Sequence, residues 1–92
     1  MTNENKQIDI ILVRTPRCDN CVKVKEILKK LKPEFEELNI QEIDATTPEG
    51  QELVVKYGIM ASPGIIINNA LFSMGGTTEK ELREKLRSLS LS

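Results

Sequence analysis

Hydrophobic residues in the first third of the chain follow a strand pattern and then a helix pattern. Ile8 to Val13 is a short run rich in β-branched residues and predicts a buried strand, which Thr15-Pro16 ends. From Cys21 to Leu31 the apolar residues recur at helical spacing, and charged residues, mostly lysines, cover the other face. Pro33 marks the end of this helix. The segment therefore predicts a strand followed by an amphipathic helix.

The middle of the chain predicts a second strand and a second helix. Leu38 to Asp44 reads as a weaker strand. Thr47 is a good helix cap, Pro48 suits the first helical position, and Gly58 is expected to end the helix in a left-handed conformation.

The last third predicts a hairpin and a final helix. Strands at Ile65–Ile67 and Ala70–Met74 are separated by Asn68-Asn69 alone, and asparagine tolerates the positive φ of a two-residue turn. Gly75-Gly76 turns the chain, and Thr78-Glu79-Lys80-Glu81 matches a capping box. Three leucines follow at helical spacing: Leu82, Leu86 and Leu89. The order of elements predicts an α/β fold with one sheet and helices on both faces, in a single domain covering residues 1–92.

Composition and charge exclude several classes of partner. The 92 residues are 39% hydrophobic and 29% charged, with a net charge of −1 and only three aromatic residues. We expect neither nucleic acid nor an anionic membrane as a partner. The lysines between 23 and 32 are interpreted as a solvated helix face. Met1 to Gln7 is polar and lacks the apolar core of a signal peptide, so we expect a cytoplasmic protein.

Both cysteines of the chain lie three positions apart, at Cys18 and Cys21. A disulfide between them closes too short a loop to restrain the unfolded chain much, so the spacing indicates chemistry rather than a structural cross-link. Zinc or an iron–sulfur cluster needs about four ligands, and the chain has no histidine. A metal site would therefore require two copies or carboxylate ligands. Two cysteines of the core without a chemical role are a third interpretation.

The position of the pair favours thiol–disulfide exchange. Cys18 falls where a helix begins, and free amides and the helix dipole there favour a thiolate; Arg17 adds to this effect and Asp19 opposes it. Cys21 lies one turn later on the same face, within reach of the first sulfur. We expect Cys18 to be the more exposed, attacking thiol and Cys21 the more buried, resolving thiol.

These residues, taken together, resemble the thioredoxin/glutaredoxin superfamily over Ile8 to about Leu89. The motifs are Cys18-Asp19-Asn20-Cys21 opening a helix, and Tyr57-Gly58-Ile59-Met60-Ala61-Ser62-Pro63 before a hairpin. The resemblance implies a thioredoxin-like fold: a four-stranded mixed sheet in the order 2-1-3-4, with its third strand antiparallel to the first two, flanked by three helices. It also implies a cis Ser62–Pro63 bond against the disulfide, with both residues binding substrate.

The resemblance further implies a thiol–disulfide oxidoreductase that needs no metal or nucleotide cofactor. Its substrate would be a disulfide-containing protein or small molecule, its electron donor an external reductase or glutathione, and we expect a monomer. Arg17 and Asp19-Asn20 depart from the usual family residues, and the buried acid of thioredoxins would fall near Leu12, so it is missing here. Gly75-Gly76 is similar to a glutathione-binding turn, but the two-cysteine chemistry favours a dithiol donor. The alternative is a binding protein that holds metal or an iron–sulfur cluster between two copies.

Overall fold

The structure, a computed structural model, describes residues 7–91 and contains the seven predicted elements in the predicted order. They are β1 (Ile8–Arg14), α1 (Asp19–Leu31), β2 (Leu38–Asp44), α2 (Pro48–Tyr57), β3 (Gly64–Ile67), β4 (Ala70–Met74) and α3 (Glu79–Leu91).

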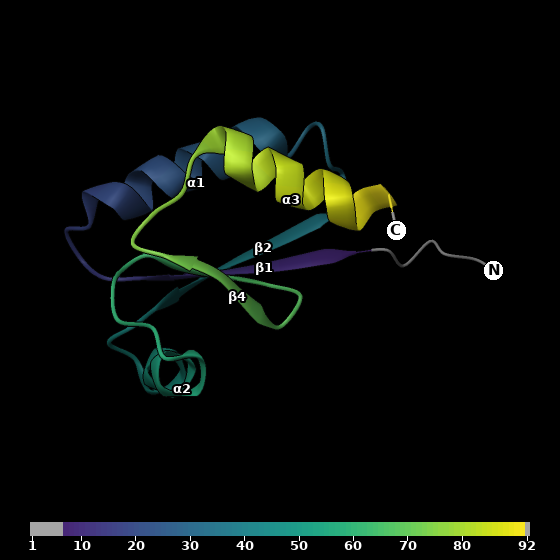
Figure 1. Cartoon of the computed structure of the whole chain (residues 1–92). Coiled ribbons are helices and arrows are strands. Elements are labelled where there is room, and N and C mark those ends of the chain that lie inside the picture. Colours follow the sequence, from purple (N-terminus) through teal and green to yellow (C-terminus); the bar gives the residue numbers. More distant parts are fainter. Residues whose placement is uncertain (1–6, 92) are drawn as a thin grey trace.

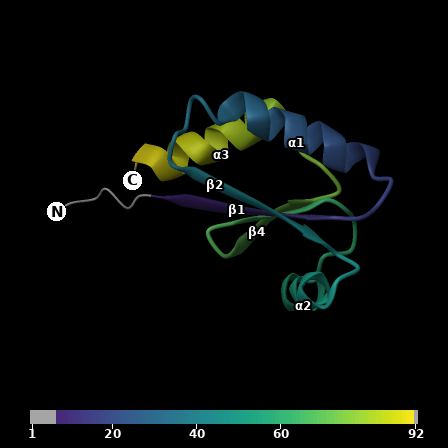
Figure 2. The same cartoon turned by 180° about the vertical axis from the view of Figure 1, so that it is seen from behind.

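The strands form one sheet in the order β2-β1-β3-β4, as expected from the resemblance. β1 pairs in parallel with β2, and β3 runs antiparallel to both β1 and β4. Helices α1 and α3 cover one face of the sheet and α2 covers the other (Figures 1 and 2). The prediction of helices on both faces is confirmed. The loop from β1 to α1 lies at the end of the sheet opposite the chain termini (Figure 1).

The two faces of the sheet bury hydrophobic cores of unequal size. Between the sheet and helices α1 and α3 lies the larger core, which takes the alternate residues Ile8, Ile10 and Leu12 of β1. Its remaining buried members are Val24, Leu28, Leu31, Phe35, Leu38, Ile65, Ile67, Leu82 and Leu86. Under α2 a smaller core contains Val13, Ile59 and Ile66. Because side chains alternate along a strand, β1 contributes side chains to both cores. This packing on both faces of the sheet holds the carboxyl end of β1 in place.

The helix caps follow the signals in the sequence. Thr47 Oγ1 accepts a hydrogen bond from the Gly50 amide at 3.1 Å, and α2 ends at Gly58 with a φ of 64°. Thr78 Oγ1 accepts a hydrogen bond from the Glu81 amide at 3.1 Å, which caps α3. The cap that begins α1 differs from these, because its acceptor is the sulfur of a cysteine.

The β3–β4 hairpin turns through Asn68 and Asn69, whose φ values of 49° and 66° confirm the left-handed turn that was predicted. The pairing shifts register between Ile65 and Ile66, an irregularity that the alternation of residues did not predict. Such a bulge bends the strand locally.

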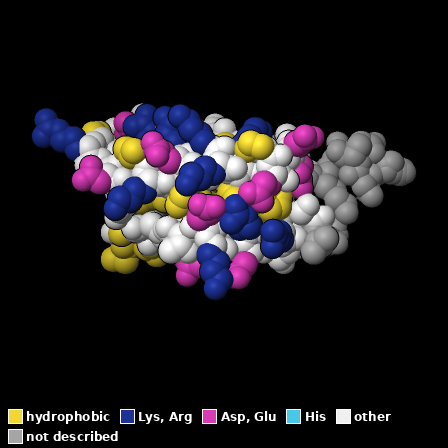
Figure 3. Space-filling model, turned by 90° about the horizontal axis from the view of Figure 1, so that it is seen from above, with side chains coloured by type: hydrophobic (Ala, Val, Ile, Leu, Met, Phe, Trp, Pro, Cys, Tyr) yellow, Lys and Arg dark blue, Asp and Glu magenta, His cyan; other side chains and the backbone are white. Residues whose placement is uncertain are grey.

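The lysine-rich face of α1 is solvated, as the sequence indicated. Figure 3 looks down on α1 and α3 and shows Lys and Arg side chains interspersed with acidic ones. Lys25 forms an ion pair with Glu42 at 3.2 Å, and Lys30 forms one with Glu79 at 3.8 Å. These neighbouring carboxylates offset part of the positive charge of the helix.

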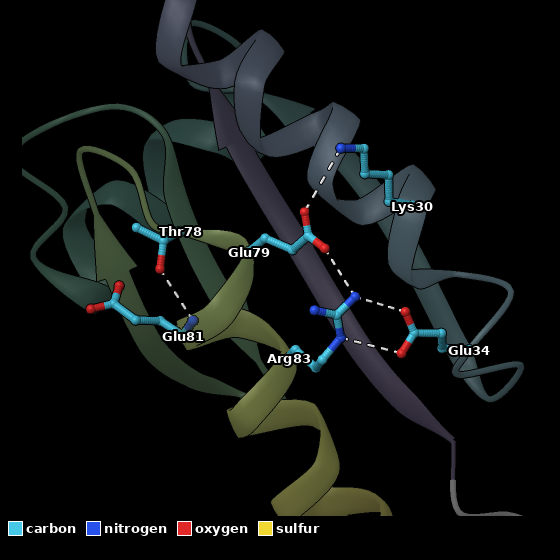
Figure 4. Close-up of polar contacts among 6 residues, drawn as sticks. All are labelled: Lys30, Glu34, Thr78, Glu79, Glu81 and Arg83. Carbon is cyan, nitrogen blue, oxygen red and sulfur yellow. Dashed lines mark hydrogen bonds and ion pairs between the residues drawn. The ribbon is translucent and has the colours of Figure 1, made fainter.

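A network of ion pairs joins α1 and the segment after it to α3 (Figure 4). Arg83 donates to both carboxylate oxygens of Glu34, at 3.2 and 2.8 Å, and to Glu79 at 2.9 Å. Hydrogen bonding from Arg83 holds the pKa of Glu34 below its ordinary value. The same contacts with Glu34 and Glu79 raise the pKa of Arg83.

Arg83→Gln should lower the melting temperature by a few degrees at neutral pH and by less in acid. A carboxylate whose pKa is lowered by folding stabilises the native state above its unfolded pKa, and this contribution is lost as the pH falls through the folded pKa. The difference from wild type should therefore shrink below about pH 4. Thermal melts at several pH values test this, with Lys80→Gln, an exposed position on α3, as the control. A difference that stays constant with pH would contradict the role given to Glu34.

No helix in the described part of the chain is long and apolar enough to cross a membrane. The prediction that Met1 to Gln7 lacks a targeting segment concerns residues that, except for Gln7, lie outside the described part.

Candidate active site

The two cysteines form a disulfide at the start of α1, shortly after the end of β1. Their Cα atoms are 5.2 Å apart, and Cys18 is the N-cap residue of α1. Arg17, directly before the disulfide, has a φ of 58°, which residues other than glycine and asparagine rarely adopt. The sharp turn at Arg17 carries the chain from the strand into the helix and leaves Cys18 at the helix start.

The two sulfurs have different environments, as predicted. Cys21 is buried, with 5% of its surface exposed, and lies on the inner face of α1, whereas Cys18 is only partly buried. The Cys18 sulfur accepts a hydrogen bond from the Cys21 amide at 3.1 Å. After reduction, this amide and the positive end of the helix dipole would stabilise a thiolate at Cys18.

The loop before β3 brings Ser62 and Pro63 to the disulfide. The Ser62–Pro63 bond is cis, which confirms the geometry that the resemblance implied. Ser62 Oγ lies 3.6 Å from Cys18 Sγ and 2.9 Å from Thr15 Oγ1. Pro63 is buried beside it. All four predicted site residues, Cys18, Cys21, Ser62 and Pro63, therefore lie in one region, and Thr15 is an additional member that the sequence did not single out.

Two hydrogen bonds fix this loop to its neighbours. The Gly75 amide donates to the Pro63 carbonyl at 2.9 Å, and the Asn20 side chain donates to the Gly75 carbonyl at 3.1 Å. Gly75 thus links the proline loop to the first turn of α1. The sequence of the Gly75-Gly76 pair is compatible with a turn or with a glutathione contact, and in the structure Gly75 holds the proline loop and the first turn of α1 together.

One side of the disulfide faces a hollow of about 420 Å³ that is rich in charged side chains. Arg14 Nε lies 3.1 Å from a Glu42 carboxylate oxygen, and Lys25 pairs with the other oxygen. Glu42 is the register partner of Leu12, near which the resemblance places the buried acid of thioredoxins. The neighbouring strand therefore supplies a carboxylate to this side of the site. Its position depends on strand register, which the sequence does not show.

Within residues 7–91 no group of three or more His, Cys, Asp or Glu side chains is arranged to hold a metal ion.

Known proteins are similar to this chain in sequence and in fold. The thioredoxin domain family matches residues 6–87. A probable thioredoxin of Archaeoglobus fulgidus is 32% identical over 78 residues, which is 85% of each chain. A probable thioredoxin of Methanothermobacter thermautotrophicus is 29% identical over 80 residues, or 86% of this chain and 92% of the other.

The solved structure of an uncharacterized thioredoxin-like protein from Clostridium perfringens superimposes with a TM-score of 0.80 at 21% identity, covering 97% of this chain and 75% of the other. Oxidised thioredoxin O2 of Arabidopsis thaliana gives a TM-score of 0.72 at 11% identity, covering 95% of this chain and 78% of the other. At these identities the structures support the fold. The family match over residues 6–87 and the 32% identical relative show that the chain belongs to the thioredoxin domain family, as a thioredoxin-like redox protein with a Cys-x-x-Cys pair.

Proposed function

We propose that the protein is a thiol–disulfide oxidoreductase in which Cys18 attacks the substrate disulfide and Cys21 resolves the intermediate. The observation that carries this proposal is the asymmetry of the pair. Cys18 is partly exposed, caps a helix and lies 3.6 Å from Ser62 Oγ, while Cys21 is buried one turn later. An attacking thiol must be accessible and ionised, whereas a resolving thiol needs to reach only its neighbour.

The reaction transfers two electrons from the dithiol to the substrate. The Cys18 thiolate attacks one substrate sulfur, the substrate S–S bond breaks, and the first thiolate leaves. Cys21 then loses its proton to solvent and attacks Cys18 Sγ, which releases the second substrate thiolate and leaves the Cys18–Cys21 disulfide. The partner becomes a dithiol, and the protein becomes oxidised.

Ser62 and Pro63 are proposed to bind the substrate backbone. Within the described residues, neither the N–H nor the C=O of Ser62 has a hydrogen-bond partner, although β3 begins two residues later. An extended segment of substrate can therefore pair with Ser62 as an added strand. The Pro63 carbonyl is occupied by Gly75, so Pro63 contributes the shape of the loop instead of a further hydrogen bond.

The thioredoxin family implies disulfide-containing proteins as partners. We further propose that the protein acts as a monomer in the cytoplasm, where a reducing environment keeps such a pair cycling. No resident metal or nucleotide takes part in the proposed reaction, and electrons come from an external donor. We favour a dithiol reductase over glutathione as the donor, because Asp19 beside Cys18 would repel the carboxylates of glutathione.

A coupled assay tests both the activity and the donor. The oxidised protein is mixed with a protein disulfide such as insulin, and with either thioredoxin reductase plus NADPH or glutathione alone. We expect NADPH consumption that depends on this protein and on the disulfide substrate, and slower turnover with glutathione.

Two results would contradict these proposals separately. Rapid reduction by glutathione without any response to the reductase would overturn the choice of donor. If the chemically reduced protein cleaves no disulfide, the oxidoreductase function itself is wrong. The Cys18→Ser/Cys21→Ser double variant shows the background rate in each assay.

A further inference from the structure

Two methionines lie near the backbone of Ser62. Met60 is two residues before Ser62 in the same loop, and Met74 is the last residue of β4. The backbone amide of Met60 donates a hydrogen bond to Met74 Sδ, with 3.3 Å between nitrogen and sulfur. Neither methionine belongs to the two hydrophobic cores, so the packing of the cores does not explain a thioether at either position.

Both residues are open to solvent. Met60 has 89% and Met74 has 40% of its surface exposed. A dissolved oxidant such as hydrogen peroxide can therefore reach both side chains, which burial in a core would prevent. Oxidation converts a flexible, apolar methionine side chain into a polar sulfoxide, and dedicated reductases reverse the change.

The end of β4 holds the loop at two points, one on each side of Ser62. Before Ser62, the Met60 amide is bonded to Met74 Sδ. After it, the Pro63 carbonyl accepts a hydrogen bond from the amide of Gly75, the residue next to Met74, at 2.9 Å. A loop that is held in its binding conformation loses less freedom when a substrate pairs with it. The Met74 sulfur therefore helps to prepare the Ser62 backbone for an extended substrate.

Oxidation of Met74 would remove the contact that involves its sulfur. A thioether sulfur is a weak hydrogen-bond acceptor, whereas a sulfoxide oxygen is strongly polar and turns toward water when the side chain is partly exposed. The added oxygen also takes up space around the sulfur. The direct contact between the Met60 amide and Met74 Sδ is then lost, and the loop is held on one side of Ser62 only.

We propose that Met74 is a site of reversible oxidation by hydrogen peroxide, and that its sulfoxide slows the reaction of the protein with polypeptide disulfides. In the modification the O–O bond of the peroxide breaks, one oxygen forms an S=O bond with Met74 Sδ, and the other leaves as water. The sulfur loses the two electrons that the peroxide gains. This inference rests on the proposed function, because it assumes that Cys18 attacks a polypeptide that pairs with Ser62.

The test compares two reagents before and after peroxide treatment. The protein is treated while Cys18 and Cys21 form their disulfide, which protects both sulfurs, and is then freed of peroxide and reduced with dithiothreitol. One reagent is a peptide whose single cysteine is joined by a disulfide to 2-nitro-5-thiobenzoate. The other is the symmetric disulfide of 2-nitro-5-thiobenzoate, which has no peptide backbone. In both, Cys18 attack breaks the S–S bond and releases the coloured thiolate, whose rate of appearance is measured.

Met60→Leu and Met74→Leu form a matched pair of variants. Met60→Leu keeps the backbone amide and the Met74 sulfur, so peroxide should slow its reaction with the peptide about threefold, as in wild type, and leave the symmetric disulfide unaffected. Met74→Leu has no sulfur to accept the hydrogen bond. It should react with the peptide about threefold more slowly even without peroxide, and treatment should slow it no further. Met1, the third methionine, is present in every variant.

Mass spectrometry of tryptic peptides keeps the proposal testable if Met74→Leu does not fold. In Met60→Leu, the loss of rate should follow the fraction of Met74 that is oxidised, and treatment with methionine sulfoxide reductases should restore the rate. A rate with the peptide that stays the same when Met74 is fully oxidised, or that is not restored, would overturn the inference. If the untreated, reduced protein attacks neither reagent, the proposed function itself fails.

Discussion

Cys21→Ser is expected to accumulate a covalent mixed disulfide with its substrate, whereas Cys18→Ser should form almost none. Removing the buried sulfur leaves Cys18 able to attack but prevents release of the product. Removing Cys18 leaves a thiol with only 5% of its surface exposed, which an external disulfide reaches poorly. We expect adduct yields to differ by at least about tenfold, since exchange depends on both access and ionisation.

The measurement is mass spectrometry of each variant after incubation with a disulfide peptide, followed by alkylation rates as a function of pH. In reduced wild-type protein, one thiol should titrate below the free-cysteine pKa of about 8.5, because the helix N-terminus favours its thiolate. Ser62→Ala serves as a companion variant, because it removes the hydroxyl next to Cys18 Sγ while both sulfurs remain. Equal adducts from both cysteine variants, with equal thiol reactivity, would show that the two roles are assigned wrongly.

Gly50→Ala should destabilise the protein by roughly 2–3 kcal/mol, although alanine is the better helix former. Gly50 is buried in the first turn of α2, against the end of β2. A methyl group at this position would lie 2.0 Å from the Asp44 carbonyl oxygen and 2.7 Å from the Ala45 Cα atom. Both are backbone atoms, so the conflict is relieved only if α2 moves away from the sheet.

Urea unfolding at neutral pH measures this loss. Gly58→Ala is the matched control, because Gly58 has a φ of 64° but nothing within 4 Å of an added methyl group. Its cost should be only about 1–2 kcal/mol, from the left-handed conformation. A Gly50→Ala variant that unfolds at the same urea concentration as wild type, or at a higher one, would mean that the close packing of α2 on β2 is wrong.

The local elements of this protein were predictable because each carries its own signal. The run from Ile8 indicates a strand, Thr47-Pro48 begins a helix, and Asn68-Asn69 allows a two-residue turn whichever residues lie around it. These preferences arise from backbone sterics and from hydrogen bonds between near neighbours, so they need no tertiary information. The strand order and the cis bond at Ser62 were expected only through resemblance to a family.

The cysteine pair was also evident from the sequence, because three positions along a helix place two sulfurs on the same face. By itself the sequence determined the order of the elements, the reactive pair and the asymmetry between Cys18 and Cys21. Each of these depends on residues that are close together in the chain.

Only the tertiary structure decided which distant residues complete the site. Ser62 Oγ meets Cys18 across 44 positions, Glu42 meets Arg14 through strand register, and Gly75 links Pro63 to α1. The charged hollow beside the disulfide has the same origin. The physical reason is that local preferences set the conformation of each segment, whereas register and packing between segments set which side chains meet.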